Sequence, residues 1–243
     1  MPAELESTLE VLTWNDPESF VELMDRRGDE VAAVLTEPAV FNTGCILPEP
    51  GYLELLRSET RKHGALLIFD EVITGFRFAR GGGAQEWFGV LPDLTTLAKG
   101  LGGGVPGRGR RRYHRSHGAR RVRAVFALGT YNANVVQCAA VSATMDVLAE
   151  PGLYERQRAL GYRLAEGLSS LATERGLDAY VEGAGHCLPA LVRRWSHPQL
   201  ARRGGPGRRG VVHPVVSRDG GTRSVVPPVA VRESVRLAGT RRP

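Results

Sequence analysis

A chain of 243 residues, 42% of them hydrophobic, is long enough to bury the core of one or two domains. It contains no apolar run of about 18 residues and no basic and apolar leader, so the sequence predicts a cytoplasmic protein with neither a membrane-spanning helix nor a signal peptide. The net charge of +6 comes from residues 107–125 and 186–243, because the remainder is acidic.

The first predicted elements form a βαβ unit. Asp16 followed by Pro17 predicts the start of a helix that ends before Gly28. Apolar runs at 31–35 and 66–69 predict two buried strands, and a helix that begins at Tyr52 and ends at Gly64 lies between them. This order predicts a parallel sheet, and ligands in such sheets lie beyond the carboxyl ends of the strands.

Three carboxylates follow these two strands, namely Glu37, Asp70 and Glu71. Residues 93–98 predict a third strand that leads into Lys99 and the three glycines at 102–104. Glycine allows the backbone to approach a ligand closely. The sequence therefore predicts a ligand site at this edge of the sheet.

The second half of the chain is less regular. Residues 107–125 have no amphipathic period and eight arginines without an acidic residue, so we expect irregular structure there. Helices are predicted at 136–148 and 151–175, and a strand at 180–183. Residues 186–243 are rich in arginine, glycine and proline, and we expect them to be poorly ordered.

Lys99 stands out because lysine is rare in this sequence. The chain has 32 basic residues, and only Lys62 and Lys99 among them are lysines. Lys62 lies at the polar end of a predicted helix. Lysine can form a Schiff base with a carbonyl group and arginine cannot, so Lys99 is the candidate reactive amine.

Other chemistries are disfavoured by missing partners. The run that ends in Asp70 resembles the magnesium-binding strand of nucleotide hydrolases, but no GxxxxGK[ST] phosphate loop precedes it. His114 and His117 lie among arginines that would repel a divalent cation, and the sequence has no HExxH or CxxC motif. A serine hydrolase is disfavoured because the GxSxG motif is missing. Cys45, Cys138 and Cys187 are odd in number and widely spaced, which favours free thiols.

Three segments carry a resemblance, and their order along the chain matches that of a known family. FDEVITGFR, PDLTTLAKGLGGGVP and GTYNAN resemble the class III pyridoxal-phosphate-dependent aminotransferases, particularly the glutamate-1-semialdehyde 2,1-aminomutase branch. The resemblance implies an α/β fold, part of the aspartate aminotransferase-like large domain of fold type I with a parallel-rich sheet, followed by a residual C-terminal small-domain segment. It also implies pyridoxal 5'-phosphate as cofactor, a small-molecule amino donor and acceptor, and a homodimer.

The resemblance also assigns roles to four residues. Lys99 resembles the lysine that forms the Schiff base and moves the proton during amino transfer, and Asp70 resembles the carboxylate that pairs with the pyridine nitrogen. Val72 lies two residues beyond Asp70 and, on an extended chain, would share its side and pack on the ring. Thr130 resembles the threonine that contacts the cofactor phosphate across the dimer interface. Glu37 and Glu71 are expected to support the site or to be structural.

By this resemblance, residues 1–150 are a partial cofactor-binding domain, 151–185 are a linker helix with the start of a small domain, and 186–243 lie outside the matching pattern. The family's phosphate loop and the aromatic residue that stacks on its cofactor come from an upstream half that this sequence does not contain. We therefore expect an N-terminally truncated, partly altered copy that binds the cofactor weakly. The alternative is a non-catalytic basic protein that binds nucleic acid or another polyanion through its arginine-rich segments, a hypothesis that only charge supports.

Overall fold

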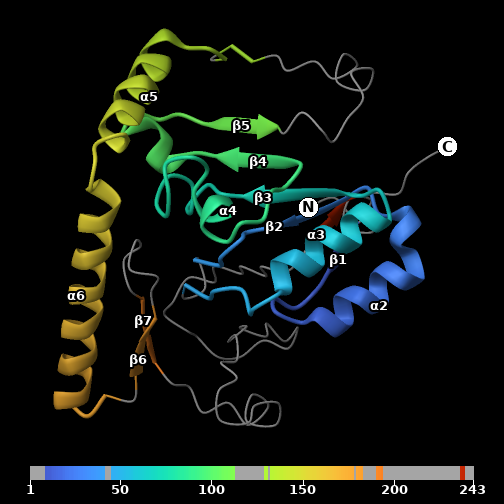
Figure 1. Cartoon of the computed structure of the whole chain (residues 1–243), viewed down its shortest axis with the longest axis horizontal. Helices are drawn as coiled ribbons and strands as arrows, with labels where there is room; N and C mark the ends of the chain where they lie inside the picture. Colours follow the sequence, from blue (N-terminus) through green and yellow to red (C-terminus); the bar gives the residue numbers. More distant parts are fainter. Residues whose placement is uncertain are drawn as a thin grey trace, which may run out of the picture.

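The structure, a computed structural model, describes residues 9–41, 45–112, 129–130, 132–177, 179–182, 190–193 and 236–238. Its centre is a six-stranded sheet in the order β1-β8-β2-β3-β4-β5 (Figure 1). The strands are β1 (Leu9–Val11), β2 (Ala33–Thr36), β3 (Leu66–Asp70), β4 (Leu94–Leu97), β5 (Gly109–Arg112) and β8 (Arg236–Ala238). The central strands β2, β3 and β4 are parallel, and the outer pairings are antiparallel.

Five α-helices accompany the sheet in the described part of the chain. They are α2 (Pro17–Arg27), α3 (Tyr52–Lys62), α4 (Ala84–Trp87), α5 (Val135–Leu148) and α6 (Leu153–Glu174). Short 3-10 helices, η1 (Gly28–Glu30) and η2 (Lys99–Gly102), follow α2 and β4. A separate hairpin pairs β6 (Ala179–Glu182) with β7 (Ala190–Arg193) beside α6 (Figure 1). None of the helices in the described ranges is long and apolar enough to cross a membrane.

The predicted βαβ unit is confirmed as β2, α3 and β3. The Asp16 side chain accepts a hydrogen bond from the Ser19 amide, at 3.1 Å, and so caps the first turn of α2, which starts at Pro17. The long helix predicted at 151–175 is α6, and the strands predicted near residues 93–98 and 180–183 are β4 and β6.

Strands also occur where the sequence predicted irregular or poorly ordered structure. Residues 109–112 form β5, which pairs with the free edge of β4, and β7 and β8 lie within the segment 186–243. Strand pairing is carried by backbone groups, and charged side chains are common on edge strands such as β5, so an arginine-rich sequence can supply this strand. The remaining residues of 107–125 and 186–243 that carry this prediction lie mostly outside the described residues.

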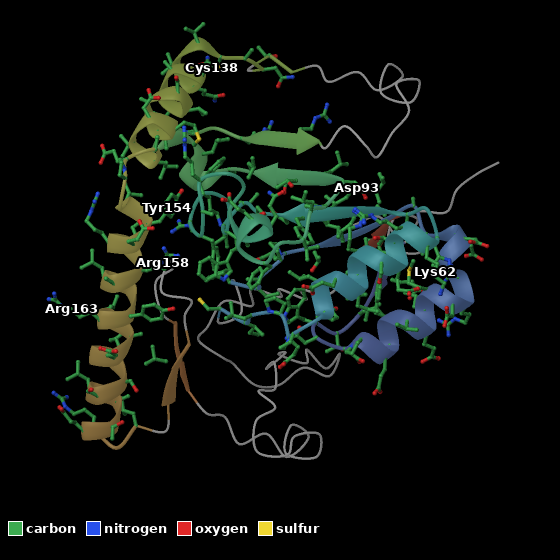
Figure 2. All side chains as sticks on the ribbon, in the orientation of Figure 1. Lys62, Asp93, Cys138, Tyr154, Arg158 and Arg163 are labelled. Carbon is green, nitrogen blue, oxygen red and sulfur yellow. The ribbon has the colours of Figure 1, made fainter. Side chains whose placement is uncertain are left out.

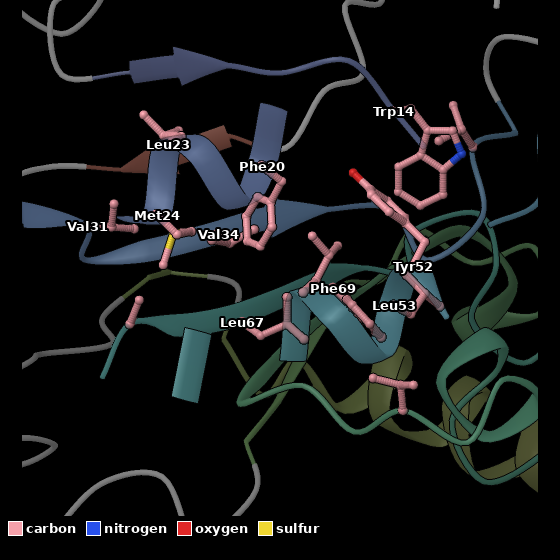
Figure 3. Close-up of a cluster of buried hydrophobic side chains, with 14 residues drawn as sticks. Trp14, Phe20, Leu23, Met24, Val31, Val34, Tyr52, Leu53, Leu67 and Phe69 are labelled. Atoms are coloured by element: carbon pink, nitrogen blue, oxygen red, sulfur yellow. The ribbon is translucent and has the colours of Figure 1, made fainter. Parts of the chain in front are cut away.

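The main core lies between the sheet and the pair α2 and α3 (Figure 3). Side chains alternate along β3, with Leu67 and Phe69 fully buried and Leu66, Ile68 and Asp70 half-buried. Phe20, Met24 and Leu56 contribute fully buried side chains from the two helices. Asp70 therefore lies on the face of the sheet opposite to this core.

A buried ion pair joins α3 to the start of β4. Arg57 Nη1 donates to Asp93 Oδ2 over 2.9 Å, and the two side chains are only 11% and 14% exposed. The same oxygen accepts a 2.8 Å hydrogen bond from the Leu67 amide, and the Asp93 amide donates to the Leu67 carbonyl over 2.8 Å. Asp93 thus fixes where β4 begins relative to β3.

We expect Arg57→Met to lower the free energy of unfolding by about 3 kcal/mol, because it leaves the Asp93 carboxylate buried without its cation. Arg61→Met is the matched control, since Arg61 is exposed on the same helix. Its effect should stay within about 0.5 kcal/mol. Urea denaturation of the three proteins measures the difference, and equal losses for both variants would contradict the role of the ion pair.

Candidate active site

The candidate site lies where the parallel strands β3 and β4 end. Asp70 is the last residue of β3, and its Cα partner on β4 is Thr96. Lys99 follows Thr96 by three residues and opens η2, just beyond the end of β4. The register therefore brings the carboxylate and the amine to the same edge of the sheet.

The Asp70 carboxylate is held through one of its two oxygens. Oδ1 accepts a hydrogen bond of 2.9 Å from the Thr96 hydroxyl and one of 3.1 Å from the Val72 amide. Within the described residues, Oδ2 accepts no hydrogen bond. Because Asp70 is only half-buried, that second oxygen remains available to a ligand.

Lys99 is an exposed amine on a strained backbone. Its φ of 46° lies in the left-handed region, which costs a non-glycine residue about 1–2 kcal/mol. Among the described residues, its ammonium group has no ion-pair or hydrogen-bond partner. Gly103 and Gly104 follow with φ of 55° and 105°, and a Cβ at Gly104 would meet nothing within 4 Å. The turn that follows Lys99 therefore has open space at Gly104.

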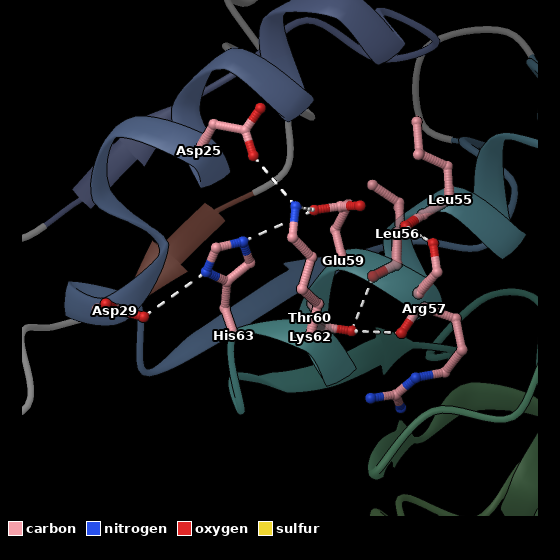
Figure 4. Close-up of polar contacts among 10 residues, drawn as sticks. Asp25, Asp29, Leu55, Leu56, Arg57, Glu59, Thr60, Lys62 and His63 are labelled. Carbon is pink, nitrogen blue, oxygen red and sulfur yellow. Dashed lines mark hydrogen bonds and ion pairs between the residues drawn. The ribbon is translucent and has the colours of Figure 1, made fainter.

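Lys62, unlike Lys99, has its amine held by two carboxylates (Figure 4). Its Nζ lies 3.1 Å from Asp25 Oδ1 and 3.2 Å from Glu59 Oε2, and these two carboxylates, Asp25 first, raise its pKa. A lysine held protonated in this way is a poor nucleophile. The ion pairs therefore distinguish Lys62 from Lys99, whose amine has no such partner among the described residues.

Glu71 organises the loop that follows β3. Its fully buried carboxylate accepts hydrogen bonds from the Ala84 amide (2.7 Å), the Gln85 amide (3.0 Å) and the Thr74 hydroxyl (3.0 Å). Burial raises the pKa of this carboxyl group, and the three donors oppose that rise. A Cβ at Gly83, where φ is 77°, would collide with Glu71 Oε2. Glu71 therefore has a structural role, which is one of the two roles expected for it.

The other candidate residues are Val72 on the turn after Asp70, the exposed Thr130 and the buried Glu37. The chain turns after Asp70 instead of continuing as a strand, so strand alternation does not set the direction of Val72. Its amide nonetheless binds Asp70. Thr130 is exposed, and the structure describes no contact between it and Asp70 or Lys99. Glu37 is buried and accepts a 3.1 Å hydrogen bond from the Phe41 amide.

Helix α6 braces the loop that Glu71 organises (Figure 2). The Tyr154 hydroxyl donates to the Phe76 carbonyl over 3.0 Å, and the Arg158 guanidinium lies 5.5 Å from the centre of the Trp87 ring. On the other side of the site, α5 packs on the turn after Lys99, since a Cβ at Gly103 would lie 2.5 Å from Thr144 Oγ1. Helices from the second half of the chain therefore support both sides of the site.

Sequence reasoning missed Thr96 and Gly83. Thr96 can be recognised as the partner of Asp70 only when the register of β3 and β4 is known. Asp93, which binds the Leu67 amide, is the residue that could have indicated that register. Gly83 was one of three consecutive glycines, and nothing in the sequence alone pairs it with Glu71, twelve residues earlier.

Known proteins resemble this chain in sequence. The model of the family "Aminotransferase class-III" matches residues 6–192. The glutamate-1-semialdehyde 2,1-aminomutase of Syntrophobacter fumaroxidans is 46% identical over 177 residues, which are 70% of this chain and 39% of that protein. The corresponding protein of Rhodopirellula baltica is 45% identical over 213 residues, which are 85% of this chain and 48% of that protein.

Solved structures give the same result for the fold. An omega-transaminase from Sphaerobacter thermophilus matches with a TM-score of 0.64 at 35% identity, over 72% of this chain and 40% of its own. A glutamate-1-semialdehyde aminomutase variant from Pseudomonas aeruginosa, in complex with PMP, matches with a TM-score of 0.61 at 27% identity, over 71% of this chain and 40% of its own. The expected fold, part of a fold type I domain, is confirmed.

The chain spans less than half the length of these curated relatives. The family model nevertheless covers most of the chain, and it includes the ends of β3 and β4 with Asp70 and Lys99. The chain belongs to the class III aminotransferase family.

Proposed function

We propose that this chain is the part of a pyridoxal-phosphate-dependent aminotransferase or aminomutase that holds the reactive end of the cofactor. The observation that carries the proposal is the pair formed by Lys99 and Asp70 at neighbouring strand ends, the amine without a described partner and the carboxylate with one free oxygen. The relatives' names and the bound PMP in one of the solved structures support it.

The residues present fit the cofactor in their chemistry. When bound, pyridoxal phosphate supplies an aldehyde that reacts with primary amines and a pyridinium ring that withdraws electrons from the substrate. Lys99 would hold the aldehyde end, and Asp70 Oδ2 would accept a hydrogen bond from the protonated ring nitrogen. Val72 would pack against the ring, and Thr130 of one subunit would contact the phosphate in the other.

Lys99 would also move the proton. With the cofactor bound, the Lys99 amine would act as the base and acid that takes the proton from the substrate α-carbon and returns it. Asp70 would keep the ring nitrogen protonated during this transfer, because the negative carboxylate favours the positive ring. The substrate would be a small amino compound, and the amino group would move either within it or to a second molecule.

The alternative of a polyanion-binding protein receives no support from these comparisons. The family model and the relatives and structures named above are all of aminotransferases and aminomutases. Of the arginine-rich segment 107–125, only residues 107–112 belong to the described structure, and four of these residues form β5.

Adding pyridoxal phosphate to the purified chain and reducing with borohydride should label Lys99, and Lys99→Ala should lose the label because the amine is gone. Lys62→Ala is the matched control and should keep the label, since Lys62 is tied to Asp25 and Glu59. Mass spectrometry of the digested protein locates the modification. A label on Lys62, or none, would count against the proposed function.

We also propose that the active protein is a homodimer. Helix α5 has no buried residue, and its Val135 and Val136 side chains are 80% and 66% exposed. Leu160 on α6 is 63% exposed. Exposed apolar side chains gathered on two helices favour a subunit interface. Sedimentation equilibrium should give twice the chain mass, and a monomer at tens of micromolar would contradict this proposal.

A further inference from the structure

Two consecutive threonines on β4 differ in what their hydroxyl groups bind. Thr95 is the Cα partner of Phe69, and both side chains are fully buried on the core face. Within the described residues, the Thr95 hydroxyl is buried without a hydrogen-bond partner. Thr96 is the Cα partner of Asp70 on the other face, and its hydroxyl donates to Asp70 Oδ1 over 2.9 Å.

The two donors to Asp70 come from different parts of the backbone. Thr96 belongs to the neighbouring strand, whereas the Val72 amide belongs to the turn that follows Asp70 itself. Two donors on a single oxygen fix the rotation of the carboxylate, since neither can be kept if the group turns. A hydrogen bond to an ionised group is also stronger than one between neutral groups.

We propose that Thr96 is a positioning residue that directs Asp70 Oδ2 at the ring nitrogen of the cofactor. This inference rests on the proposed function. Thr96 and the Val72 amide occupy Oδ1, so the second oxygen is the one left for the ring. A carboxylate that is free to rotate presents this oxygen only part of the time, which weakens its hold on the protonated nitrogen.

Arg110 is the neighbour that could compete for the carboxylate. It is the Cα partner of Thr96 on β5, so Asp70, Thr96 and Arg110 form one row across three strands. Two strand spacings, about 10 Å, separate the backbones of Asp70 and Arg110. Arg110 is exposed, and no ion pair joins it to Asp70 in the described structure. Thr96 is the nearer group and makes the contact.

The experiment compares Thr96→Val, Thr96→Ser and Thr95→Val in the full chain, loaded with pyridoxal phosphate labelled with ¹⁵N in the ring. Valine keeps the shape of threonine and removes the hydroxyl, and serine keeps the hydroxyl. We expect Thr96→Val to shift the ring ¹⁵N resonance toward the unprotonated position and to weaken cofactor binding by about five- to tenfold, the effect of one lost hydrogen bond. Thr96→Ser and Thr95→Val should match the unsubstituted protein in both measurements.

The other possible results separate a failure of this inference from a failure of the proposed function. If Thr96→Val leaves both the resonance and the affinity unchanged while Lys99 still takes the label, this inference fails and the proposed function stands. Equal losses in Thr96→Val and Thr95→Val would also overturn it, because packing alone would then explain them. If the unsubstituted chain takes no label at Lys99, the proposed function and this inference fail together. Should Thr96→Val not fold, Thr96→Ala compared with Thr96→Ser gives the same test.

Discussion

The register between β3 and β4 is the constraint on which the candidate site depends. Asp93 sets it with two hydrogen bonds to Leu67 and an ion pair with Arg57. From that fixed start, Thr96 comes opposite Asp70, and Lys99 follows at the strand end. A slip of one residue would turn Thr96 to the core face and Thr95 to the site. A structural ion pair on the core side of the sheet thus determines which hydroxyl meets the Asp70 carboxylate.

In two pairs of like-charged residues, one member is held by the surrounding structure and the other is not. Asp70 and Glu71 are adjacent, yet Glu71 is fully buried and satisfied by loop amides while Asp70 keeps one oxygen free. Lys62 and Lys99 differ in the same way, since carboxylates hold the first and the second stands on a strained turn. In each pair, one member is tied to other side chains or amides and the other remains available for a ligand.

Much of this could be predicted from the sequence, because the signals are local. The Asp16 and Pro17 cap, the apolar strands and the rarity of lysine each depend on a few adjacent residues. Register and loop geometry depend on contacts between distant residues, which explains why Thr96, Gly83 and Tyr154 were missed. The turn at Val72 was missed because the chain was expected to stay extended beyond the apolar run, whereas it turns directly after Asp70. Strand β5 was missed because its pairing uses the backbone and leaves no apolar pattern.

A crystal structure of the chain grown with pyridoxal phosphate tests the central claim most directly. The account predicts continuous electron density from Lys99 Nζ to the cofactor, with Asp70 Oδ2 within hydrogen-bond distance of the ring nitrogen and Oδ1 still bound to Thr96. A cofactor attached at Lys99 whose ring nitrogen points away from Asp70, or a cofactor bound elsewhere on the chain, would contradict it.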